Sequence, residues 1–282
     1  MNIPDQVAGL LERRVERPVS SPVDDDTVQL WCDTFGWTRP ADRSAVPPLA
    51  YPTFLRPAGS SEGTAPTGVI LHDELKRALD LPVAIAVGYE LELLGGPRRG
   101  QRLTAVERIS ELGEERETSL GPGRAWTIEV AASTTDGDSV GVERFRMLGY
   151  RPGVSGSAAQ RTDVVDRTPA WTEQIEIDEA TIQRSARANR VWVAAHHDRA
   201  AARAAGLTDI ILDTSSQVAL LTSAARRRRP NAEPSRVALT MRRPVLPGSN
   251  LVLGGVDGGP RSTVWATVVG RETSRAVITF ED

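Results

Sequence analysis

One order of signals occurs twice along this chain, and this repetition limits the possible folds more than any other sequence feature. In each half, a helical pattern is followed by several segments in which apolar and polar residues alternate, separated by glycine-rich turns. The alternating segments predict antiparallel strands, because short turns join neighbouring strands in that arrangement. The apolar face of such a sheet must be covered by another element. We therefore predict an α+β fold in which each sheet wraps around a central helix.

The first half is expected to form an N-terminal domain over residues 1–150. Its helices are predicted at 25–35 and 72–79. Between them, the proline-rich stretch 40–66 predicts a long irregular segment, since proline interrupts both helices and strands. The alternating patterns predict strands at 83–94, 102–112, 126–133 and 140–150.

The second half is expected to form a C-terminal domain over residues 168–282, after a linker at 151–167 that is rich in Gly and Ser. Asp178 is the predicted N-cap of its first helix. Helices are predicted at 179–189, 198–205 and 214–225, and strands at 171–177, 236–241, 250–254, 263–270 and 275–280. The repeated order predicts a double hot-dog fold, and two unrelated α+β domains remain the alternative at this point.

The composition excludes several classes of protein. The chain has 282 residues, 40% hydrophobic, with a net charge of -3, which argues against nucleic acid as the main partner. No apolar run approaches the length of a transmembrane helix, and no secretory signal is visible. Cys32 is the only cysteine, so we expect no disulfide and a cytoplasmic location. The only histidines are His72, His196 and His197, and their spacing predicts neither a metal site nor a cofactor.

The segment Arg190–Asp198, RVWVAAHHD, is followed by an Ala-rich stretch ending at Gly206. It resembles the signature of the MaoC-like (R)-specific enoyl-CoA hydratases and acyl dehydratases. That signature is an aspartate, four residues, a histidine, one residue and a second aspartate before a short Ala-rich helix. Met241–Gly248 resembles a turn of the same family, and the first half resembles its N-terminal hot dog. The resemblance implies a lyase that acts on acyl thioesters of CoA or of an acyl-carrier protein.

The resemblance also implies roles for single residues. In this family a histidine and an aspartate transfer protons, and a backbone N–H at the start of the central helix stabilises the thioester oxygen. His196 matches the family histidine, and the N–H of Thr214 or of Asp213 matches the helix-start donor. The catalytic aspartate falls at Val191, which cannot transfer a proton. Asp213 is the candidate to compensate as a second catalytic residue, and the alternative is that it only caps the helix.

Three more residues are expected to shape the substrate pocket. His72 lies at the start of the first half's helix, where the resemblance implies a pocket wall. Trp192 and His197 match a branch of the family with an aromatic residue and a doubled histidine, and Asp198 is expected to cap the Ala-rich helix. The run Arg226–Arg229 predicts either a solvated surface or a site for the phosphates of CoA.

Three functions stay open on the sequence alone. The first is hydration or dehydration of acyl thioesters with an atypical active site. The second is a repurposed hot-dog cyclase or isomerase, and the third is a non-catalytic acyl-binding subunit of a heteromeric dehydratase. We expect the two sheets to join side by side, with an acyl tunnel between the central helices. We also expect a homodimer or a complex with another hot-dog chain.

Overall fold

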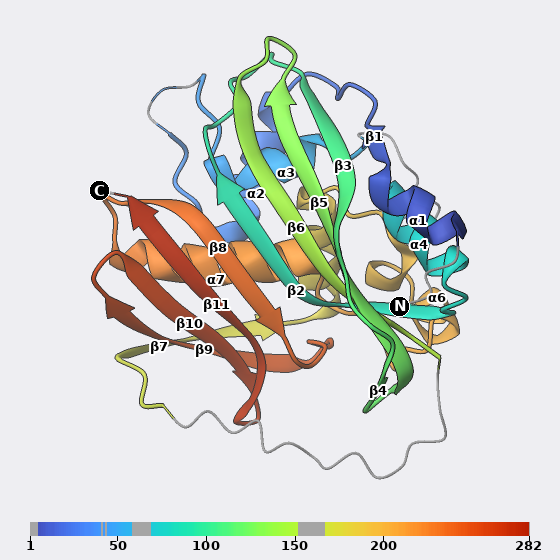
Figure 1. Cartoon of the computed structure of the whole chain (residues 1–282). Helices are drawn as coiled ribbons and strands as arrows, with labels where there is room; N and C mark the ends of the chain where they lie inside the picture. The colour runs from blue at the N-terminus through green and yellow to red at the C-terminus, as the bar shows by residue number, and fades with distance from the viewer. Residues whose placement is uncertain (1–4, 41, 43, 58–68, 152–166, 282) are drawn as a thin grey trace.

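The described strands form a single antiparallel sheet that runs through both halves of the chain (Figure 1). This computed structural model describes residues 5–40, 42, 44–57, 69–151 and 167–281. The first half contributes β1 (Arg14–Glu16), β2 (Val83–Leu93), β3 (Leu103–Leu112), β4 (Arg116–Thr118), β5 (Gly121–Thr134) and β6 (Ser139–Tyr150). The second half contributes β7 (Trp171–Ile177), β8 (Glu233–Met241), β9 (Ser249–Gly258), β10 (Arg261–Val268) and β11 (Arg271–Glu281).

The strand order repeats the duplication seen in the sequence. The sheet runs β1-β3-β5-β6-β2-β8-β11-β10-β9-β7, and β4 pairs with β5. From the outer edge inward, the order β1-β3-β5-β6-β2 of the first half corresponds to the order β7-β9-β10-β11-β8 of the second half. The halves meet where β2 and β8 pair antiparallel, with Gly88 opposite Thr240 and Glu92 opposite Arg236. The predicted joining of the two sheets is confirmed.

Helices cover one face of the sheet, as Figure 1 shows for α7, which runs behind β8 and β11. They are α1 (Asp5–Glu12), α2 (Asp25–Phe35), α3 (Tyr51–Phe54), α4 (Ile70–Ala78), α5 (Glu179–Ala188), α6 (Arg199–Ala204) and α7 (Thr214–Arg228). In the first half, Leu71 and Leu75 of α4 are buried against Ile128 of β5. In the second half, Leu221 of α7 is buried against Ile278 of β11. Each half therefore wraps its sheet around a helix, and the double hot-dog fold is confirmed.

Aspartate side chains start four of these helices. Asp24, Asp178, Asp198 and Asp213 each accept a hydrogen bond from the backbone N–H three residues later, at 2.6–2.9 Å. A capping carboxylate satisfies an amide that has no partner inside the helix and interacts favourably with the helix dipole. The expected capping roles of Asp178 and Asp198 are confirmed.

Two parts of the first half differ from the expectation. Residues Pro48–Phe54 of the proline-rich stretch form a 3-10 turn and α3, and Tyr51 and Phe54 are buried in the core. Proline is compatible with the first turn of a helix, so these prolines do not prevent helical structure. In addition, β5 begins at Gly121, earlier than expected, because it pairs with β4. Most of the predicted linker, at 152–166, lies outside the described residues.

The arginine run ends α7 and is held by specific contacts. Arg227 pairs with Glu173 at 2.6 Å. The other three guanidinium groups lie over aromatic rings: Arg226 over Trp37 at 4.5 Å, Arg228 over Trp171 at 5.3 Å and Arg229 over Phe280 at 5.3 Å. Cation–π contacts and positive charge at a helix C-terminus are both stabilising. In the part of the chain that the structure describes, no helix is long and apolar enough to cross a membrane.

Candidate functional site

A cavity of about 190 Å³, here called the inner cavity, is lined by the starts of both central helices. It brings together four of the predicted site residues: His72, His196, Asp213 and Thr214. The other residues that line it and are used below are Arg17, Arg56, Glu143, Phe145, Met147, Val191, Val193 and Ser215. Trp192 and His197, also expected at the pocket, do not line it.

His196 has the geometry of a proton acceptor. Its Nδ1 lies 2.8 Å from the carbonyl oxygen of Ile211, and a carbonyl only accepts, so Nδ1 carries the ring proton. Nε2 then keeps its lone pair. Burial lowers the pKa of His196, and the charge of Asp213 partly offsets this effect. The imidazole is therefore neutral near pH 7 and can take a proton through Nε2.

Asp213 caps α7 with both of its carboxylate oxygens. One oxygen accepts from the backbone N–H of Ser216 at 2.9 Å, and the other accepts from the Ser216 hydroxyl. The side chain is buried, and among the described residues no hydrogen bond joins it to His196. The capping role is thus observed. Its influence on His196 is through charge, since the carboxylate raises the pKa of the imidazole.

The first half of the chain helps to fix the start of α7. Trp31 of α2 donates from Nε1 to Oδ1 of Asn189 at 3.0 Å, and Asn189 donates from Nδ2 to the Ser216 hydroxyl oxygen at 3.1 Å. Trp31, Asn189 and Ser216 are all buried. This chain of hydrogen bonds ends on the capping carboxylate of Asp213, so both halves determine where the helix begins.

The first two amides of α7 are available for a ligand. The N–H groups of Thr214 and Ser215 have no hydrogen-bond acceptor among the residues that the structure describes. The hydroxyl of Thr214 donates to the sulfur of Met241 at 3.6 Å. The helix is 15 residues long, and the positive end of its dipole lies at these amides. Both features favour a ligand oxygen that carries or develops negative charge.

Trp192 and His197 shape the loop before the cavity. Nε2 of His197 donates to the carbonyl oxygen of Val191 at 2.7 Å, and Nε1 of Trp192 donates to that of Pro57 at 2.9 Å. The two rings stack with their centroids 6.1 Å apart. These contacts hold the Val191 backbone, while the Val191 side chain lines the cavity where the resemblance expects a carboxylate.

Three charged residues of the inner cavity were not predicted: Arg17, which pairs with buried Glu107, and Arg56 and Glu143. Arg56 donates from Nη1 to the Asn189 carbonyl oxygen and from Nη2 to the Ser215 hydroxyl oxygen, each at 3.0 Å. Glu143 is buried, accepts from the Tyr89 hydroxyl at 2.6 Å, and lies 3.8 Å from Arg56. Alternation along β6 could have identified Glu143 on the inward face, whereas Arg56 lies in the proline-rich stretch, which shows no periodic pattern.

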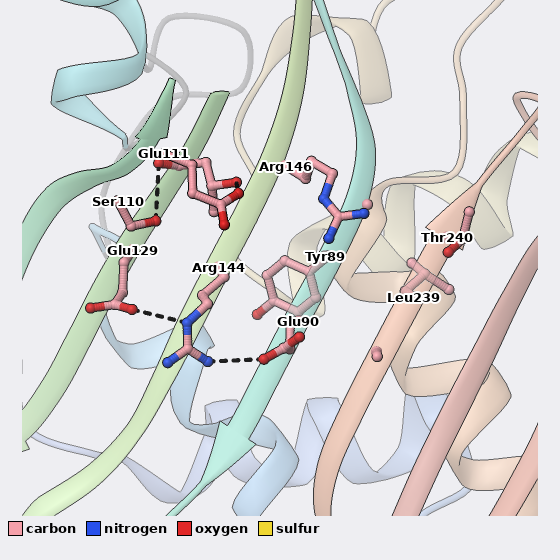
Figure 2. A pocket seen from close by; sticks show the side chains of 12 residues that line it. Tyr89, Glu90, Ser110, Glu111, Glu129, Arg144, Arg146, Leu239 and Thr240 are labelled. Carbon is pink, nitrogen blue, oxygen red and sulfur yellow. Dashed lines mark hydrogen bonds and ion pairs between the residues drawn. The ribbon is translucent and has the colours of Figure 1, made fainter. Parts of the chain in front are cut away.

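A larger cavity, of about 400 Å³, lies on the other face of the sheet (Figure 2). There Arg144, the residue after Glu143 on β6, lies between Glu129 and Glu90, 2.9 Å from each. Arg108 pairs with Glu129 from the next strand. These charges satisfy one another in register across four strands, so we assign the chemistry to the inner cavity despite its smaller volume.

No protein-family profile matches the sequence, and no curated protein matches it. Solved structures match over nearly the whole chain. HtdX of Mycobacterium tuberculosis is 17% identical with a TM-score of 0.64, over 94% of this chain and 99% of that one. A MaoC-like dehydratase from Phytophthora capsici is 11% identical with a TM-score of 0.72, over 100% and 98%.

A conserved hypothetical protein of Mycobacterium tuberculosis, described as having a double hotdog fold, is also similar. It is 14% identical with a TM-score of 0.60, over 95% of this chain and 96% of that one. At this level of identity the similarity establishes the architecture. The chain therefore has the double hot-dog fold that is found in MaoC-like dehydratases.

Proposed function

We propose that the chain catalyses the reversible addition of water to a 2-enoyl thioester of CoA or of an acyl-carrier protein. One observation carries the proposal: the inner cavity is lined by the His196 imidazole and by two helix amides that have no acceptor among the described residues. His196 supplies proton transfer, and the amides of Thr214 and Ser215 supply stabilisation of the thioester oxygen.

In the proposed reaction a single nitrogen, Nε2 of His196, makes both proton transfers. Nε2 of His196 takes a proton from water while the water oxygen bonds to the β-carbon. The electrons of the C=C bond move toward the thioester oxygen, which becomes an enolate held by the amides of Thr214 and Ser215. The imidazolium then returns its proton to the α-carbon, which restores the C=O bond. Asp213 contributes through its charge, because it favours the imidazolium that forms between the two steps.

The lining of the cavity suggests a short acyl group. Phe145, Met147, Val191 and Val193 give much of it an apolar surface. Its volume of about 190 Å³ is small beside the roughly 300–1,000 Å³ of typical ligand pockets. His72 contributes to the far wall, on the side of the first half.

The proposal is tested by incubating the protein with a series of 2-enoyl-CoA thioesters from four carbons upward. Hydration is measured by the loss of enoyl absorbance. We expect His196→Ala to lower kcat roughly 10²- to 10⁴-fold, the usual cost of losing a positioned acid–base group. Added imidazole should restore part of the rate. Absence of turnover by the natural chain, or an undiminished rate in His196→Ala, would refute the proposal.

Val191 favours a second candidate, a non-catalytic acyl-binding subunit. It predicts that the protein binds acyl thioesters without turnover and co-purifies with a hot-dog chain that has an intact aspartate and histidine. A cyclase or isomerase would instead consume an acyl thioester without adding water, which mass spectrometry of the product detects. Light scattering on the purified protein distinguishes the expected homodimer from a heteromer.

A further inference from the structure

We propose that Arg56 is a catalytic residue whose guanidinium contacts the thioester oxygen together with the first amides of α7. This inference rests on the proposed hydration and identifies a source of charge stabilisation for its enolate. Arg56 lies two residues after the end of α3, in the proline-rich part of the first half, and reaches across to the helix start of the second half.

The position of the guanidinium follows from two hydrogen bonds. Nη1 donates to the carbonyl oxygen of Asn189 and Nη2 to the hydroxyl oxygen of Ser215, both at 3.0 Å. Bond lengths place a serine hydroxyl oxygen roughly 3 Å from its own backbone nitrogen. Nη2 therefore lies within roughly 6 Å of the Ser215 amide nitrogen, and Arg56 and Ser215 both line the inner cavity.

The contacts of the guanidinium with the described residues leave donors for a ligand. Arginine carries five N–H groups, and the contacts to Asn189 and Ser215 use two of them. The Glu143 carboxylate lies 3.8 Å from Nη2, so it balances the charge of the guanidinium without making a normal hydrogen bond to it. The Tyr89 hydroxyl holds this carboxylate at 2.6 Å, so Glu143 acts as a positioning residue for Arg56.

The local charges favour an anion that forms during the reaction. Arg56 places a cation beside the positive end of the α7 dipole, and both attract an oxygen on which negative charge develops. The carboxylates of Asp213 and Glu143 are both held by other donors. An enolate oxygen supplies this charge in the transition state more than in the substrate, so the interaction raises kcat.

A buried imidazole, that of His72, also lines the inner cavity. His72 is 5% exposed, lines the cavity, and its Nδ1 has no hydrogen-bond partner among the described residues. The ring packs against Trp126 with the centroids 5.6 Å apart, so His72 serves as a wall of the cavity.

The test compares Arg56→Met with Arg144→Met, a matched change on the opposite face of the sheet. With crotonyl-CoA as substrate, we expect Arg56→Met to lower kcat roughly 10²- to 10³-fold with little change in KM. Arg56→Lys should recover part of the loss, and Arg144→Met should leave kcat within about twofold. A kcat that Arg56→Met does not lower would overturn the inference.

A second readout reports the contact itself. Butyryl-CoA with a ¹³C-labelled carbonyl cannot be hydrated, and its C=O stretch should move to lower frequency on binding to the natural chain. Arg56→Met should lose much of this shift, and Arg144→Met should keep it. An equal shift in folded Arg56→Met overturns the inference, and Arg56→Gln replaces this variant if it does not fold. A shift that depends on Arg56, without turnover of any enoyl thioester, would support the contact while refuting the proposed function.

Discussion

The starts of α4 and α7 hold equivalent places in the two halves, yet they have different partners. In α4, the amides of Ile70 and Leu71 donate to the carboxylate of Glu107 at 3.2 and 2.6 Å. Arg17 pairs with the same carboxylate at 2.9 Å, and Glu107 is fully buried. In α7, Thr214 and Ser215 line the inner cavity, and their amides have no acceptor among the described residues.

The different partners of α4 and α7 indicate what a helix start in this fold can bind. Glu107 places a carboxylate on two successive amides with an arginine beside it, so the first half carries an internal anion. The second half has the same kinds of donor, two amides and Arg56, around an open space. The filled site supports the proposal that the open one receives the thioester oxygen of a substrate.

The largest expected effect is on the filled site. Glu107→Leu should lower the free energy of unfolding by about 3–5 kcal/mol, because Arg17 is left buried without its counter-charge. Urea unfolding measures this change. The double variant Arg17→Met/Glu107→Leu removes both charges and should recover much of the loss. A single-variant loss below about 1 kcal/mol would contradict the assignment of Glu107 as a structural anion.

A carboxylate restored to the open site should change catalysis. Val191→Asp places an acid–base group in the cavity that holds His196, and we expect kcat for enoyl thioester hydration to rise roughly 10- to 100-fold. Val191→Asn is the matched control, since it has similar size and polarity but cannot accept a proton. Equal rates in these two variants would show that the position no longer serves proton transfer.

Removal of the α7 cap tests how this helix start is held. Asp213→Ala should cost about 0.5–2 kcal/mol of stability. It should also lower the pKa of His196 further, because the Asp213 carboxylate raises that pKa. Asp178→Ala removes a cap of the same type from α5, where the aspartate is exposed, and should leave the His196 pKa unchanged. NMR titration of the imidazole checks both variants, and no movement in Asp213→Ala would argue against charge coupling.

The smallest expected effect is a loss of stability in mild acid, to which each half contributes one histidine. Burial lowers the pKa of His72 and of His196, so the unfolded chain binds protons first as the pH falls. The stability that these two lowered pKa values contribute is fully present above about pH 6.5. It is lost as the pH falls below that value toward the folded-state pKa. Thermal unfolding between pH 7 and 5 measures the loss, and His72→Phe should reduce its slope. If the slope is unchanged in His72→Phe, the loss of stability in mild acid comes from other groups.

Local patterns in the sequence predicted most of the fold. Alternation identified the long strands, and aspartate caps identified the starts of α5 and α6. The three-residue strand β1 was missed, since it is too short to show alternation and depends on pairing with β3.

The candidate site was predicted only in part, and the misses have two causes. Glu143 alternates in phase with Phe145 and Met147 along β6, so an inward carboxylate was detectable in the sequence. Arg56 was not detectable, because its role depends on contacts with Asn189 and Ser215, more than 130 residues away. Contacts between the halves are set by tertiary packing, which short-range patterns do not encode.

The pairing of β2 with β8 has a consequence for how the two copies can diverge. Two identical subunits related by a twofold axis must carry the same residue at both symmetry-related positions. Here one continuous polypeptide supplies both copies and joins them through backbone hydrogen bonds between Gly88–Glu92 and Arg236–Thr240. Each copy can therefore acquire its own substitutions. The helix start of one copy can be filled by a buried carboxylate, as in α4, while that of the other remains open to a ligand, as we propose for α7.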